Sequence, residues 1–120
     1  MKKLFAMAIP ILPGKSAQFN KFINELKTTR HNEFMESRRK LGVRERTFLQ
    51  KTPMGDYIVV TLEGEDPQTA FANFGQSKDD FTKWFASQVK DIHGIDLNSP
   101  PEEGQLPELV MDSMEEVYHL

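Results

Sequence analysis

The chain has 120 residues, of which 38% are hydrophobic and 28% charged, and its formal net charge is −3. These values are typical of one globular domain, and the acidic balance argues against general nucleic-acid binding. The absence of cysteine excludes disulfides and thiolate metal sites and favours a reducing cytoplasm. No run approaches the ~20 apolar residues that span a bilayer, so no membrane association is expected.

The first predicted element is a strand at residues 4–11. Apolar residues occupy both of its alternating faces, as in a strand that is covered on both sides. Two lysines precede it, as in a secretory signal. Because Pro10 interrupts the short apolar run and no small-residue cleavage site follows, a strand is the better interpretation.

A helix is predicted to begin near Ser16 and to end at Gly42. Its first apolar positions follow the spacing of one helix face: Phe19, Phe22, Ile23 and Leu26. The continued stripe then passes through Arg30. The pattern leaves two alternatives open, because either the helix kinks at Thr28-Thr29 or Arg30 points a charge inward.

The segments Val43–Gln50 and Tyr57–Leu62 are predicted to form a β-hairpin, since both are rich in β-branched and aromatic residues. The turn between them contains Pro53, which presets φ, and Gly55, which is free to adopt a positive φ. Both faces of the second strand carry apolar groups, as in the first strand. The predicted sheet therefore requires cover on both sides.

Two further helices are predicted after the hairpin. A short helix over Gln68–Phe74 follows the capping pair Asp66-Pro67, and a longer helix runs from the Ser77 region to His93. The longer helix has an apolar stripe at helical spacing: Phe81, Trp84, Phe85, Gln88, Val89 and Ile92.

The alternation from Leu106 to Met114 predicts a final strand. One domain at 1–120 thus has a core at 1–97, a linker at 98–107, a last strand at 108–114 and a tail at 115–120.

The predicted order β-α-β-β-α-β is that of a ferredoxin-like α+β fold, with a four-stranded antiparallel sheet and helices on one face. The other face is predicted to expose apolar side chains from each strand: Met7 or its neighbours, Tyr57, Val59 and Phe48 or Leu49. A second copy of the chain is the simplest cover for such a face. We therefore expect a homodimer whose two sheets enclose a partly polar cavity.

Four segments, Glu36–Val43, Phe48–Asp56, Trp84-Phe85 and Ile92–Asp96, carry a resemblance to known proteins. The architecture resembles the dimeric α+β barrel superfamily, which includes antibiotic-biosynthesis-monooxygenase-like proteins and haem-degrading monooxygenases. Over about Ser16–Leu97 the chain looks more closely like a small bacterial family with no assigned activity. The resemblance implies the barrel fold, whereas the superfamily's chemistry is analogy only.

His93 is the first candidate for chemistry, as a proton acceptor. It ends its helix, where the negative end of the dipole is expected to raise its basicity, and Asp96 is a candidate orienting partner. The alternative is a helix-terminal histidine that rests on its own backbone. Haem is not expected, because Trp84 and His93 are nine residues apart on opposite sides of an ideal helix.

Charged residues near the hairpin form the second candidate group. Arg30 or Arg38 would grip an anionic ligand, with Glu45 lining the same cavity. The alternatives are a buried or interfacial ion pair and a solvated helix face. Tyr57 as a hydrogen-bond donor and Trp84 complete the ligand-binding candidates.

Other sites find little support in the sequence. The basic cluster Arg38-Arg39-Lys40 is interleaved with glutamates, so nucleic-acid binding is not expected. His31, His93 and His119 do not share a helical face, so no metal site is expected. No cofactor is expected either.

Three functional hypotheses follow. The first is a cofactor-independent enzyme such as a monooxygenase. The second is a non-catalytic dimer that binds either a protein partner or a small ligand that is anionic or aromatic. The third is a purely structural dimer. The sheet face that the expected dimer encloses is mixed in polarity, with Glu45, Thr47, Tyr57 and Thr61 among its apolar groups, and this favours ligand binding.

Overall fold

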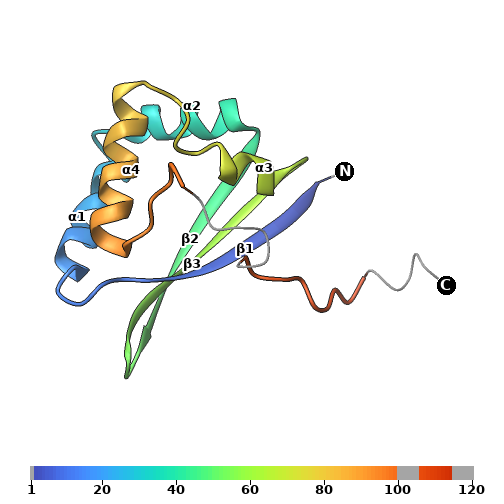
Figure 1. Ribbon diagram of the computed structural model, residues 1–120, viewed down its shortest axis with the longest axis horizontal. Coiled ribbons are helices and arrows are strands. Elements are labelled where there is room, and N and C mark those ends of the chain that lie inside the picture. Colours follow the sequence, from blue (N-terminus) through green and yellow to red (C-terminus); the bar gives the residue numbers. More distant parts are fainter. Residues whose placement is uncertain (1, 100–105, 115–120) are drawn as a thin grey trace.

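The computed structural model describes residues 2–99 and 106–114 and shows an α+β fold in which helices cover one face of an antiparallel sheet (Figure 1). The sheet has three strands, β1 (Lys3–Pro10), β2 (Val43–Thr52) and β3 (Gly55–Gly64), in the order β1-β3-β2. The predicted hairpin is confirmed, and its strands are longer than expected because pairing continues to Thr52 opposite Gly55.

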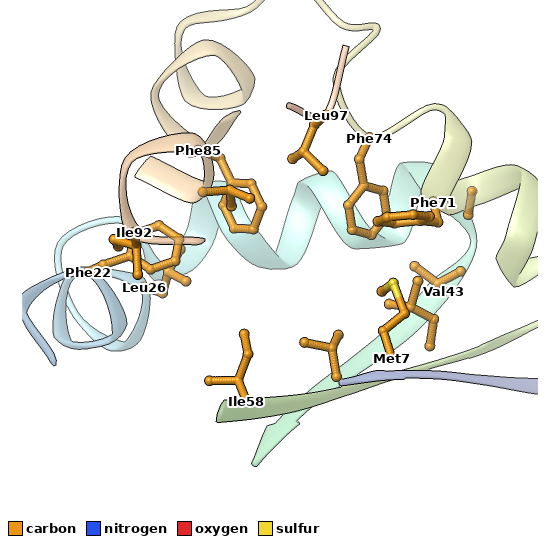
Figure 2. Close-up of a cluster of buried hydrophobic side chains, with 14 of the residues drawn as sticks. Met7, Phe22, Leu26, Val43, Ile58, Phe71, Phe74, Phe85, Ile92 and Leu97 are labelled. Atoms are coloured by element: carbon orange, nitrogen blue, oxygen red, sulfur yellow. The ribbon is translucent and has the colours of Figure 1, made fainter. Parts of the chain in front are cut away.

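The strand register separates an inner from an outer sheet face. Val60 pairs with both Met7 and Thr47, so these three side chains lie in one row beneath the helices. Phe5, Met7, Ile58, Val60 and Leu62 are all buried on this inner face. In Figure 2, side chains of the helices point toward Ile58 on the sheet.

The expected long helix is two helices, α1 (Ser16–Lys27) and α2 (His31–Leu41), so the kink at Thr28-Thr29 is the alternative that the structure confirms. The Thr28 hydroxyl donates to the Asn24 carbonyl at 2.7 Å, which satisfies an acceptor where the helix stops. Gly42 ends α2 with a φ of 73°, a left-handed conformation that suits glycine.

Helices α3 (Pro67–Ala72) and α4 (Asp80–His93) both begin at an aspartate cap. Asp66 accepts from the Thr69 amide, and Asp79 accepts from the Thr82 amide at 2.8 Å. The cap of α4 is therefore Asp79 and not Ser77, whose hydroxyl instead donates to the Asp79 carboxylate.

The expected fourth strand is not formed. Residues 106–114 adopt no regular structure, and the described part of the chain builds a three-stranded sheet instead of the four-stranded ferredoxin-like one. Leu109, Val110 and Met111 are 69%, 87% and 77% exposed, so this segment has no apolar surface against which its alternating side chains could pack. The alternation alone was insufficient because a strand also requires a partner edge.

The outer sheet face lacks cover in the described part of the chain. Leu4, Phe48 and Tyr57 are 61%, 57% and 38% exposed on it. Met7 and Leu49, which were alternatives for this face, belong to the inner face, because Met7 is buried there and Leu49 pairs with Ile58.

Candidate ligand cavity

A cavity of about 670 Å³ lies between the inner sheet face and helices α1, α2 and α4. Most of its wall is apolar, including Met7, Phe22, Leu26, Ile58, Val60 and Phe85. Several of these side chains face one another across the core in Figure 2. A volume of this size exceeds ordinary packing defects and falls within the range of small-molecule sites.

The inner face of β2 explains why the space stays open on one side. Where the middle of β1 and β3 presents large apolar side chains, the middle of β2 presents Glu45 and Thr47, between the apolar Val43 and Leu49. The exposed residues of the cavity wall come from β2, α1 and the start of α2, so the mouth lies there. Asn20, Asn24 and Lys27 follow one another at i, i+4 and i+7 along this side of α1.

Arg38 and Glu45 form a buried ion pair beside the cavity. Nε of Arg38 lies 2.6 Å from Oε1 of Glu45, and the two side chains are only 7% and 9% exposed. Nη1 donates to the Ser37 hydroxyl at 2.9 Å, whereas Nη2 is buried without a hydrogen-bond partner. The pair links α2 to β2, and Glu45 lines the cavity.

Three aromatic rings surround the Arg38 guanidinium. Its Cζ lies 4.9, 4.3 and 4.5 Å from the ring centroids of Phe34, Phe74 and Phe85. These contacts offset part of the cost of burying the cation. All three rings also line the cavity, so the ion pair and the cavity wall share their supporting residues.

His93 lies in the cavity wall and is 5% exposed. Its Nδ1 is 2.8 Å from the Pro10 carbonyl, and its ring makes an edge contact with Phe19. Since a carbonyl only accepts, Nδ1 carries the proton and donates. The ring therefore rests on the backbone of a distant segment and not on that of its own helix, and it also lines the cavity.

The pKa of His93 is lowered, contrary to the expected rise at the helix end. Burial disfavours the imidazolium, and this effect exceeds the opposing contribution of the Pro10 hydrogen bond. The expected partner Asp96 is engaged elsewhere, since its carboxylate accepts from the Asn98 amide at 2.9 Å.

Four of the five predicted ligand-binding residues do not line the cavity: Arg30, Arg38, Tyr57 and Trp84. The Arg30 guanidinium stacks over the Trp84 ring at 4.2 Å and lies 3.5 Å from Glu33. Tyr57 belongs to the outer sheet face, because the adjacent Ile58 is on the inner one.

Arg38 and Glu45 are brought together as a pair, and of the predicted residues only Glu45 and His93 line the cavity. Thr47 was predicted among the polar groups of the sheet face, whereas the α1 residues at the mouth were missed. Their one signal was the helical spacing of Asn20, Asn24 and Lys27.

A smaller, more polar pocket of about 330 Å³ lies between α2 and the start of α4. Glu33, Glu36, Asp79 and Asp80 contribute to it. Within residues 2–99 and 106–114, no three histidine, aspartate or glutamate side chains are grouped to hold a metal ion. In the same ranges no helix combines the length and apolar character needed to cross a membrane.

Comparison of the chain with protein-family models, curated proteins and solved structures gives no match.

The Arg38–Glu45 pair gives a first testable prediction. Glu45→Leu alone should lower the free energy of unfolding by about 3–5 kcal/mol, because it leaves the Arg38 charge buried without its carboxylate. The double variant Arg38→Met/Glu45→Leu should recover most of this loss. Urea unfolding of both variants and the wild type measures the difference, and a double variant as unstable as the single one would contradict the interpretation.

The lowered pKa of His93 gives a second prediction. The unfolded chain protonates this residue near its ordinary pKa of 6.5, whereas the folded protein resists protonation. The contribution of neutral His93 to the free energy of unfolding is therefore fully present above pH 6.5. It is lost as the pH falls toward the pKa of His93 in the folded protein. The loss can reach about 1.4 kcal/mol per pH unit.

Urea unfolding between about pH 8 and pH 5.5 measures this effect. His93→Asn is the matched variant, because its amide can still donate to Pro10 but does not titrate. The variant should lose less stability than the wild type over this interval. Equal losses in the two proteins would refute the assignment to His93.

Proposed function

We propose that the protein binds a small, mainly apolar molecule in the cavity between its sheet and its helices. The observation that carries this proposal is the 670 Å³ cavity itself, with its largely apolar wall. Water in such a space finds few hydrogen-bond partners, so an apolar molecule that displaces it gains free energy. The polar groups at the mouth and in the wall would orient the molecule.

Proton abstraction from the bound molecule is a second candidate function, favoured by one observation. His93 is buried and has a lowered pKa, so it is neutral near pH 7 and able to accept a proton. The resemblance to cofactor-independent monooxygenases makes such chemistry reasonable for this fold. Binding comes first in either case, because His93 acts only on a molecule that the cavity holds.

We further propose that two copies associate through the outer sheet face, as in a dimeric α+β barrel. The exposed Leu4, Phe48 and Tyr57 support this, since they extend over all three strands. Leu109, Val110 and Met111 supply further exposed apolar surface. In such a dimer, residues 108–114 would find the partner edge that they lack in one chain and would complete a four-stranded sheet.

Blocking the mouth tests ligand binding. Thr47→Trp places a large ring at the exposed edge of the cavity and should reduce binding of a co-purified or screened apolar molecule by at least about tenfold, since the cavity wall is otherwise rigid and packed. Gln50→Trp is the matched control, because it puts the same ring on the outer face of the same strand. Native mass spectrometry and calorimetry measure both. Undiminished binding by Thr47→Trp would place the ligand elsewhere.

Sedimentation velocity at micromolar concentration tests the dimer. The wild type should sediment as a dimer, and Phe48→Lys should sediment as a monomer, because the charge would be buried unpaired in the interface. Met54→Lys is the control, since Met54 is 93% exposed at the hairpin tip and should leave the dimer intact. A monomeric wild type would rule out this association.

A further inference from the structure

Two hydrogen-bond acceptors are available to a molecule in the cavity. Oε1 of Glu45 is engaged by Arg38, and Nδ1 of His93 is engaged by Pro10. Among the described residues, Oε2 of Glu45 and Nε2 of His93 have no partner. Neither atom is among the fully buried side-chain atoms without a partner, and both residues line the cavity.

The hydrogen bonds that these two groups already make leave both atoms as acceptors. Because Nδ1 of His93 donates to Pro10 and the ring is neutral, Nε2 carries a lone pair. The Glu45 carboxylate, held by Arg38, has a second oxygen with free lone pairs. An acceptor in an apolar wall costs free energy unless a donor meets it.

The interior offers no free cation in the part of the chain that the structure describes. The Arg38 charge is matched by Glu45, and its unpartnered Nη2 belongs to a residue that does not line the cavity. Arg30 lies outside over Trp84. Lys27 lines the cavity only at its exposed mouth. A carboxylate inside would therefore face Glu45 without compensation, and an ammonium would meet a carboxylate whose charge is already paired.

We propose that the ligand is an uncharged molecule with an apolar body and hydroxyl groups that donate to Oε2 of Glu45 and Nε2 of His93. This inference rests on the proposed binding function and names its ligand class. It replaces the anionic ligand expected from the sequence, because the pairing of Arg38 with Glu45 leaves no cation to grip an anion.

Two isomers that differ only in their ability to donate provide the test. Decanol and methyl nonyl ether have the same atoms and nearly the same apolar surface, but only decanol donates a hydrogen bond. Calorimetric titration of the wild-type protein should give a dissociation constant at least about fivefold lower for decanol than for the ether. This factor corresponds to the net free energy of one hydrogen bond. Decanoate and decylamine should bind more weakly than decanol.

Variants assign the preference to the two acceptors. The preference for decanol is the ratio of the ether's dissociation constant to that of decanol. This ratio should fall toward one in Arg38→Met/Glu45→Leu, in His93→Phe, or in both variants. Thr82→Val is the matched control, because Thr82 is a buried polar residue that does not line the cavity, and the preference should persist there. Circular dichroism verifies that each variant is folded. A preference that survives in both acceptor variants would overturn the assignment.

The outcomes separate this inference from the proposed function. If neither isomer binds, the binding function and the inference both fail. If the isomers bind equally, the cavity still binds apolar molecules but the donor requirement is refuted. If decanoate binds more tightly than decanol, the inference is overturned and recognition moves to Lys27 at the mouth.

Discussion

The buried pair of Arg38 and Glu45 is the constraint on which the rest of the structure depends. It joins α2 to the edge strand β2, at 2.6 Å and almost without solvent contact. Burial of two charges requires a precise enclosure, which Phe34, Phe74 and Phe85 provide from three different segments. These rings then serve as cavity wall. The same arrangement therefore fixes the position of α2 and forms part of the cavity wall. It also neutralises the charge of Arg38, which would otherwise attract anions.

The cavity follows from an unequal distribution of side-chain size across the sheet. β1 and β3 direct large apolar groups toward the helices, whereas the middle of β2 directs Glu45 and Thr47. The break between α1 and α2 turns the helical layer over this thinner side. His93 closes another part of the wall by reaching Pro10, a residue 83 positions away in the chain. Contacts between distant segments thus define a space that no single element outlines.

Local signals predicted most of the fold, since capping residues, turn residues and apolar spacing act over a few neighbours. The hairpin, the Gly42 helix end and the Asp66 cap all follow such rules. The fourth strand did not form, because strand pairing depends on an edge that the sequence does not specify. Glu45 and His93 were identified as candidates, but their common cavity could not be, because it depends on how α4 docks on the sheet. The direction of the His93 pKa shift was wrong for the same reason, since burial is a tertiary property.

The two outer edges of the sheet differ in how well they resist aggregation. Arg44, Arg46 and Lys51 place charges along β2, and exposed strand edges that carry such charges are poor templates for intermolecular pairing. β1 has a lysine only at its start and Pro10 at its end, with apolar residues between them. The two edges of the sheet therefore differ. The β2 edge is protected against pairing with another strand, whereas the β1 edge is able to accept one short strand. Pro10 limits the length of that addition, because its nitrogen has no hydrogen to donate.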